Sequence, residues 1–136
     1  MADRSLYFEC SAGISGDMAV AAMLDAGADQ AMLKAALDSV PLQGFKVEIS
    51  RVKKSGIECC DFDVIIEPQH SHRHLSDVLE IIDGTKMTEK ERKLAHKIFT
   101  IIAEAESKAH GVPLDQVHFH EVGAVDSIVD VIALAV

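Results

Sequence analysis

The stretch Phe45–Ile66, FKVEISRVKKSGIECCDFDVII, decides the fold class. Its first half alternates apolar and polar residues and places Val47 and Ile49 on one face, the pattern of a strand with one solvated side. The segment KKSG puts Gly56 in a turn, and the alternation resumes through Phe62. The pattern predicts a β-hairpin over residues 45–66.

Amphipathic segments on both sides of this hairpin predict helices. The clearest begins at a capping-box pattern, Thr88 and Glu91, carries one apolar face and stops at Gly111. The other expected elements are a strand at residues 5–10 and helices at 17–27, 30–40, 75–84 and from about 123. We therefore expect an α/β fold in which a small sheet, mixed or antiparallel, packs with about five helices.

The expected domain organisation is a single domain over residues 1–136. The final apolar run, SIVDVIALAV, has no Gly, Asn or basic last turn, although helices usually end in such a signal. We therefore expect this domain to be the N-terminal part of a longer protein whose C-terminal domain is absent here.

Composition narrows the classes of function. The chain has 136 residues and a formal net charge of −9, which argues against a nucleic-acid partner because phosphate backbones need a positive footprint. There is no signal-peptide pattern and no apolar run of membrane-spanning length, so we predict a cytoplasmic protein without a membrane partner. Three cysteines give no disulfide framework.

The segment QVHFHEVGAVDSIVDV, residues 116–131, concentrates ionisable side chains in apolar surroundings. In an extended chain His118 and His120 point to the same side, next to Glu121. In the following helix Asp126 and Asp130 share one face and repel each other. A bound cation would explain both features. The alternative is that the histidines are edge-strand residues and Asp126 is a first-turn dipole partner.

Two further segments carry candidate site residues. His70, His72 and His74 alternate in a polar loop, a pattern typical of a transition-metal trap, or of a solvated loop that is merely rich in histidine. In CSAGISGDM, residues 10–18, a predicted strand, a turn and a helix N-terminus could cradle an anion. The glycine spacing fits neither a P-loop nor a dinucleotide fingerprint, and from spacing alone a tight turn is the better interpretation.

Four segments together resemble the LarC family, nickel-insertion proteins of the nickel-pincer nucleotide pathway. They are YFECSAGISGDM, HSHRHLSDV, AEAESKAHG and VHFHEVGAVDSIVDV. The resemblance implies a CTP-dependent nickel chelatase of the lyase type. Such an enzyme inserts Ni(II) into pyridinium-3,5-bisthiocarboxylic acid mononucleotide and forms nickel–carbon and nickel–sulfur bonds. Its product serves lactate racemase and related enzymes, and CTP would bind with Mg(II) or Mn(II) in the full-length protein.

The resemblance also suggests residue roles. It implies catalytic roles for His118, His120 and Glu121, and cofactor binding by Gly13, Gly16 and Asp17. The expected metal-binding residues are His70, His72, His74, His118, His120, Asp126 and Asp130. The histidine loop is shorter here than is usual in the family. The family's nucleotide site belongs largely to its C-terminal part, so this chain alone is expected to be inactive.

Two other functions remain open from the sequence. One is a metal-dependent phosphoester hydrolase, in which the His/Asp/Glu cluster activates water. It would prefer Mg, Mn or Zn and would need no thiocarboxylate. The other is a non-catalytic module that binds nickel or joins copies of the chain into a homo-oligomer.

Overall fold

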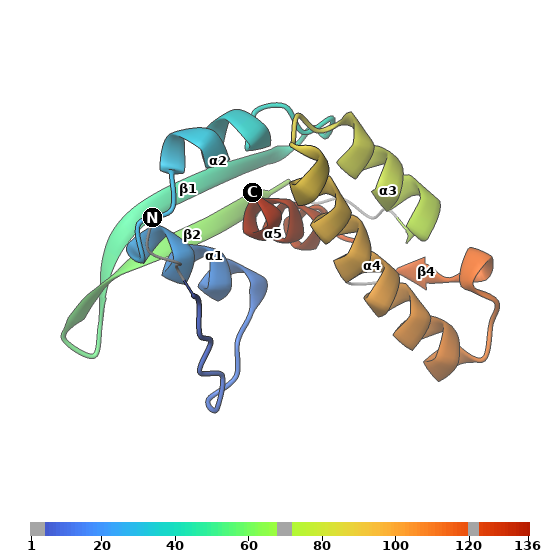
Figure 1. Cartoon of the computed structure of the whole chain (residues 1–136), viewed down its shortest axis with the longest axis horizontal. Helices are drawn as coiled ribbons and strands as arrows, with labels where there is room; N and C mark the ends of the chain where they lie inside the picture. The colour runs from blue at the N-terminus through green and yellow to red at the C-terminus, as the bar shows by residue number, and fades with distance from the viewer. Residues whose placement is uncertain (1–4, 68–71, 120–122) are drawn as a thin grey trace.

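A long hairpin forms one side of the molecule in the computed structural model, which describes residues 5–67, 72–119 and 123–136 (Figure 1). Strand β1 (Phe45–Lys54) pairs antiparallel with β2 (Ile57–Ile66) along its whole length. The connecting turn has positive φ at both Ser55 (53°) and Gly56 (82°), as a two-residue turn matched to the strand twist requires. The predicted hairpin is confirmed.

Five α-helices accompany the hairpin in the described part of the chain. They are α1 (Gly16–Asp25), α2 (Gln30–Leu37), α3 (Leu75–Gly84), α4 (Glu89–His110) and α5 (Val125–Ala135). The α/β class, with a small antiparallel sheet, is therefore confirmed. The predicted capping box starts α4: the Thr88 hydroxyl accepts from the Glu91 N–H at 3.3 Å, and the Glu91 carboxylate accepts from the Thr88 N–H at 2.7 Å. None of the described helices is both long and apolar enough to cross a membrane.

Helix α5 lies at the centre of the fold (Figure 1) and contacts α1, α2, α4 and β2. Its residues Ile128, Val129 and Ile132 are fully buried. A helix that is apolar on most sides needs partners on most sides, which explains its central position. The position matters for function because α5 also carries the two predicted site aspartates.

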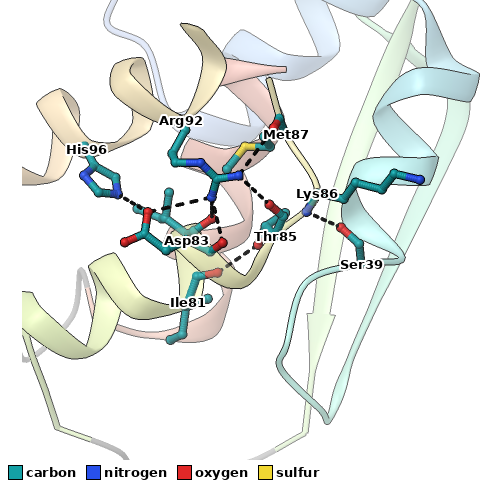
Figure 2. A network of polar contacts seen from close by, with 9 residues as sticks. Ser39, Ile81, Asp83, Thr85, Lys86, Met87, Arg92 and His96 are labelled. Atoms are coloured by element: carbon teal, nitrogen blue, oxygen red, sulfur yellow. Dashed lines mark hydrogen bonds and ion pairs between the residues drawn. The ribbon is translucent and has the colours of Figure 1, made fainter. Parts of the chain in front are cut away.

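An arginine clamp fixes the junction between α3 and α4 (Figure 2). The Arg92 guanidinium donates hydrogen bonds to four backbone carbonyls, those of Ile82, Asp83, Thr85 and Met87. Carbonyls at a helix C-terminus have no partner within the helix, and Arg92 supplies one. The neighbouring His96 Nε2 lies 2.9 Å from Asp83 Oδ1. His96 is therefore part of the structural contacts at this junction.

The predicted strand at residues 5–10 is wrong, because this segment forms no strand. Leu6, Tyr7 and Phe8 are exposed. A strand needs a partner edge for its backbone groups. On β2 the Asp25 carboxylate of α1 already accepts from the Cys60 N–H at 2.9 Å. That contact covers part of the edge that could otherwise have received the segment.

Candidate functional site

A short two-stranded bridge joins the histidine loop to the last motif. Strand β3 (Arg73–His74) pairs antiparallel with β4 (His118–Phe119), and His74 lies opposite His118. The two imidazole rings have centroids 4.0 Å apart and are tilted by 46°. From the sequence, these histidines were predicted to belong to two separate clusters. The structure places His74 and His118 side by side.

Contacts with Asp77 and Val117 fix the position of His74. Its N–H donates to Asp77 Oδ2 at 2.7 Å, in the first turn of α3. Its ring Nδ1 lies 3.2 Å from the carbonyl oxygen of Val117. In the tautomer with the hydrogen on Nδ1, the Val117 carbonyl accepts that hydrogen and the lone pair is on Nε2, the arrangement typical of metal-binding histidines.

Arg73 and Gly123 hold the start of α5 against this bridge. The Arg73 guanidinium donates to the Gly123 carbonyl at 2.6 Å. A Cβ at Gly123 would lie 2.8 Å from the Phe119 Cβ, so only glycine allows this approach. Sequence reasoning did not identify the Arg73 contact, since nothing in the spacing of HSHRH shows which distant carbonyl the arginine reaches.

The histidine pair is an open arrangement. His72 and His118 are exposed and His74 is half-buried. The predicted site residues His70, His120 and Glu121 lie outside the described residues. Within residues 5–67, 72–119 and 123–136, no three metal-binding side chains lie close enough to hold one ion. The described histidines therefore do not form a closed metal site by themselves.

A second cluster of candidate site residues lies where the start of α1 contacts α5. At the start of α1, a Cβ on Gly16 would lie 2.7 Å from Asp130 Oδ2 and 2.8 Å from the Asp130 Cβ. The Asp130 carboxylate accepts a hydrogen bond from the Asp17 backbone N–H. Asp126 lies on the same helix, α5. The structure thus brings together Gly16, Asp17, Asp126 and Asp130 from the two ends of the chain.

Asp130 is held in an unfavourable environment. Burial, and then the negative charges of Asp17 and Asp126, raise the pKa of its carboxyl from 3.8 to about 6. Its Oδ1 is buried and has no hydrogen-bond partner among the described residues. A divalent cation would relieve both penalties. Carboxylate oxygens are ligands that suit Mg(II) and Mn(II).

Gly13 lies in a turn before this cluster. Its φ is +89° and its N–H donates to the Cys10 carbonyl at 3.0 Å. A side chain would strain this backbone conformation, so the turn accounts for a glycine at this position. Cofactor binding by Gly13, Gly16 and Asp17 stays a prediction.

Replacing Gly16 by alanine is expected to lower the free energy of unfolding by about 1–3 kcal/mol, because the added methyl overlaps the Asp130 side chain. A helical Gly→Ala change without such a contact would stabilise instead, so the sign is diagnostic. Urea unfolding measures it. The exposed Met18, in the same first turn of α1, provides the control Met18→Ala. A Gly16→Ala protein more stable than the wild type would contradict the contact.

The fold and these residues define a class: a small α/β domain that offers imidazoles at one place and carboxylates at another. A family model described as "Nickel insertion protein" matches residues 6–136. The chain belongs to this family, which confirms the resemblance seen in its motifs.

Relatives with similar sequences carry a more specific name. The "Pyridinium-3,5-bisthiocarboxylic acid mononucleotide nickel insertion protein" of Alkaliphilus metalliredigens is 47% identical, over 98% of this chain and 36% of the relative. The protein of the same name from Geobacillus kaustophilus is 44% identical, over 98% of this chain and 35% of its own length. The chain therefore spans about a third of these relatives. No solved structure matches it significantly.

Proposed function

We propose that this chain is the N-terminal domain of a cytoplasmic, CTP-dependent nickel chelatase. The enzyme would insert Ni(II) into pyridinium-3,5-bisthiocarboxylic acid mononucleotide, the reaction named in its relatives. The single observation that carries the proposal is the β3–β4 bridge, which sets His74 against His118. Imidazole suits Ni(II), and a cargo ion needs a site that it can leave.

The histidines would have two tasks in this reaction. His74 and His118 would hold the arriving nickel, His70, His72 and His120 would supply further imidazoles as the ion moves, and the exposed His118 would meet the incoming substrate. A nickel–carbon bond forms only when the pyridinium carbon loses its proton, and a neutral imidazole is a suitable acceptor. We assign the catalytic roles to His118, His120 and Glu121.

The carboxylate cluster would serve the nucleotide. Asp126 and Asp130, with Asp17 close by, would bind the Mg(II) or Mn(II) that accompanies CTP. The unpartnered Oδ1 of Asp130 supports this assignment. Gly16 keeps the N-terminus of α1 close to these carboxylates, where its backbone N–H groups favour an anion.

The test is nickel insertion by the longer protein that contains this domain. His118→Ala, and the double change His118→Ala with His120→Ala, are expected to lower insertion at least about 100-fold, the scale of losing a general acid–base group. Formation of the nickel-containing product is followed by mass spectrometry. The control is His96→Gln, since His96 is paired with Asp83 at the α3–α4 junction. Insertion unchanged by both histidine variants would refute the assignment.

The carboxylate cluster also favours a second candidate, a metal-dependent phosphoester hydrolase. A metal at Asp126 and Asp130 would activate water, with no need for the histidine pair. Release of phosphate from simple phosphoesters with Mn(II), in the absence of the thiocarboxylate substrate, would select this candidate. Nickel binding without turnover in any form of the protein would instead select the non-catalytic module.

A further inference from the structure

An open apolar groove lies where the N-terminal segment meets α1, α2, α4 and the end of α5. It has a volume of about 460 Å³. Three apolar side chains of its wall stay exposed: Leu6 at 65%, Met32 at 56% and Leu94 at 44%. An apolar patch of this kind on the surface of a domain marks a place where another surface packs. The groove is therefore a candidate docking surface.

The wall of the groove favours an apolar polypeptide. No described residue of the wall is basic, and its carboxylate, Asp29, already accepts from the Ala31 N–H at 2.9 Å and the Met32 N–H at 3.1 Å as the N-cap of α2. An anion or a metal ion would find no partner there. A small ligand is usually enclosed on most sides, whereas side chains of this wall are more than half exposed.

Residues 5–10 form one rim of the groove in an extended conformation. Leu6 and Phe8 line the groove and Tyr7 between them does not, as expected when alternate side chains of an extended chain point to opposite sides. In the part of the chain that the structure describes, the two sheets are β1–β2 and β3–β4, and neither includes this segment. Its backbone can therefore still pair with an added strand.

Helix α5 brings the chain itself to the groove. Leu134 and Val136 are part of the wall. A neighbouring hollow of about 360 Å³ shares Met32 and Val136 with the groove. The chain spans about a third of the length of its relatives. In an N-terminal domain of a protein of that length, the residues that follow Val136 start directly on this apolar surface.

A tethered segment has an advantage over a second copy of the chain. A short connection gives the segment an effective concentration in the millimolar range. A second copy would have to approach against repulsion, because each chain carries a formal net charge of −9. The connection and the charge both favour the chain's own continuation as the occupant.

We propose that the segment directly after Val136 in the longer protein docks in this groove, pairs its backbone with residues 5–10 and packs apolar side chains against Leu6, Met32 and Leu94. The proposal rests on one part of the proposed function, that the chain is an N-terminal domain, and on no step of nickel insertion. Helix α1 lines the groove and also carries Asp17 of the carboxylate cluster. The docked segment would therefore link that cluster to the rest of the protein.

The first test locates the occupant by photo-crosslinking in the longer protein. The change Met32→p-benzoylphenylalanine is expected to give an intramolecular crosslink within about 15 residues after Val136, enough chain for a turn and one strand. Peptide mass spectrometry identifies the product. The control is the same crosslinker at Ile101, which is exposed on α4 and should not reach that segment. Crosslinks from position 32 to a second copy, or to a distant part of the chain, would overturn the proposal.

The second test measures burial of the groove in the longer protein. Leu94→Glu is expected to lower the midpoint of thermal unfolding by at least about 5 °C, because the docked segment would bury the new charge. Ile101→Glu is the matched control, on the same helix and 55% exposed, with an expected shift below about 2 °C. Equal shifts in the two variants would contradict a covered groove. Dissociation of a dimer by Leu94→Glu would assign the groove to a second copy instead.

The third test addresses the backbone pairing. In hydrogen–deuterium exchange of the longer protein, the amides of residues 6–9 are expected to exchange slowly, on the timescale of the paired strand β1. The turn at Ser55 and Gly56 between β1 and β2 is exposed and provides the fast-exchanging control. Amides at residues 6–9 that exchange as fast as this turn would exclude the added strand.

This proposal and the proposed function fail in different ways. If the longer protein inserts nickel but position 32 gives no crosslink to the segment after Val136, the docking is wrong and the chelatase function stands. If the crosslink forms but no form of the protein inserts nickel, the docking stands and the chelatase function is wrong.

Discussion

Replacing Phe99 by alanine is expected to lower the free energy of unfolding by about 3–5 kcal/mol, the cost of removing a large buried ring. Phe99 is 0% exposed on α4, and its ring centroid lies 6.0 Å from that of Phe119 at an angle of 58°. Tilted aromatic pairs add attraction beyond the buried area. Urea unfolding followed by circular dichroism measures the loss.

The control is Ile101→Ala, on the same helix, where the side chain is 55% exposed and the expected loss is below about 1 kcal/mol. Equal losses in the two variants would contradict the packing described. Because Phe119 is also a residue of β4, next to His118, Phe99 connects the histidine pair to the core. Phe99→Leu, which keeps much of the volume, should retain more of the stability.

Replacing Asp130 by asparagine is expected to stabilise the protein at neutral pH by roughly 1 kcal/mol, because solvent screens the half-exposed carboxylate and reduces the full value of the shift. Burial and the charges of Asp17 and Asp126 raise the pKa of the Asp130 carboxyl to about 6 from the ordinary 3.8, and each pKa unit corresponds to about 1.36 kcal/mol. The folded state thus binds this proton more tightly than the unfolded state. The contribution of Asp130 to stability therefore falls as pH rises from about 4 to about 6, and stays low above that.

The measurement is urea unfolding from pH 4 to pH 8 in the presence of a chelator. Asp130→Asn should match the wild type near pH 4 and exceed it above pH 6. The exposed Asp115 provides the control Asp115→Asn, whose effect should stay within about 0.5 kcal/mol at all pH values. A difference between Asp130→Asn and the wild type that does not change with pH would refute the raised pKa. Loss of nickel insertion in Asp130→Asn would show that the protein needs this carboxylate for function although it destabilises the fold.

The hairpin and α4 were predictable from sequence because their signals are local. Alternation and a Gly-containing turn specify β1 and β2, and a capping box with Gly111 specifies the ends of α4. The strand predicted at residues 5–10 had an apolar pattern too. Pattern alone does not provide the neighbouring strand that a ladder needs, and the prediction failed for that reason.

The two contacts that assemble the candidate site, Gly16 with Asp130 and His74 with His118, could not be predicted from local patterns. The sequence put Asp126 and Asp130 on one helix face and His118 next to an apolar anchor, and both statements depend only on local geometry. It gave no indication that Gly16 would lie against Asp130, or His74 against His118. Those contacts depend on how α1 and α3 pack against the rest of the chain. Such long-range packing leaves no periodic pattern in the sequence.

The bridge between the histidine segments is small: β3 and β4 are two residues each. Displacing β3 breaks that short ladder and the hydrogen bond from His74 to Val117, while Phe119 keeps its place on Phe99. Local opening of this kind requires far less free energy than global unfolding. If both rings hold an ion as proposed, its residence time would be set by the opening of this two-residue ladder, and the ion could leave while the core stays packed.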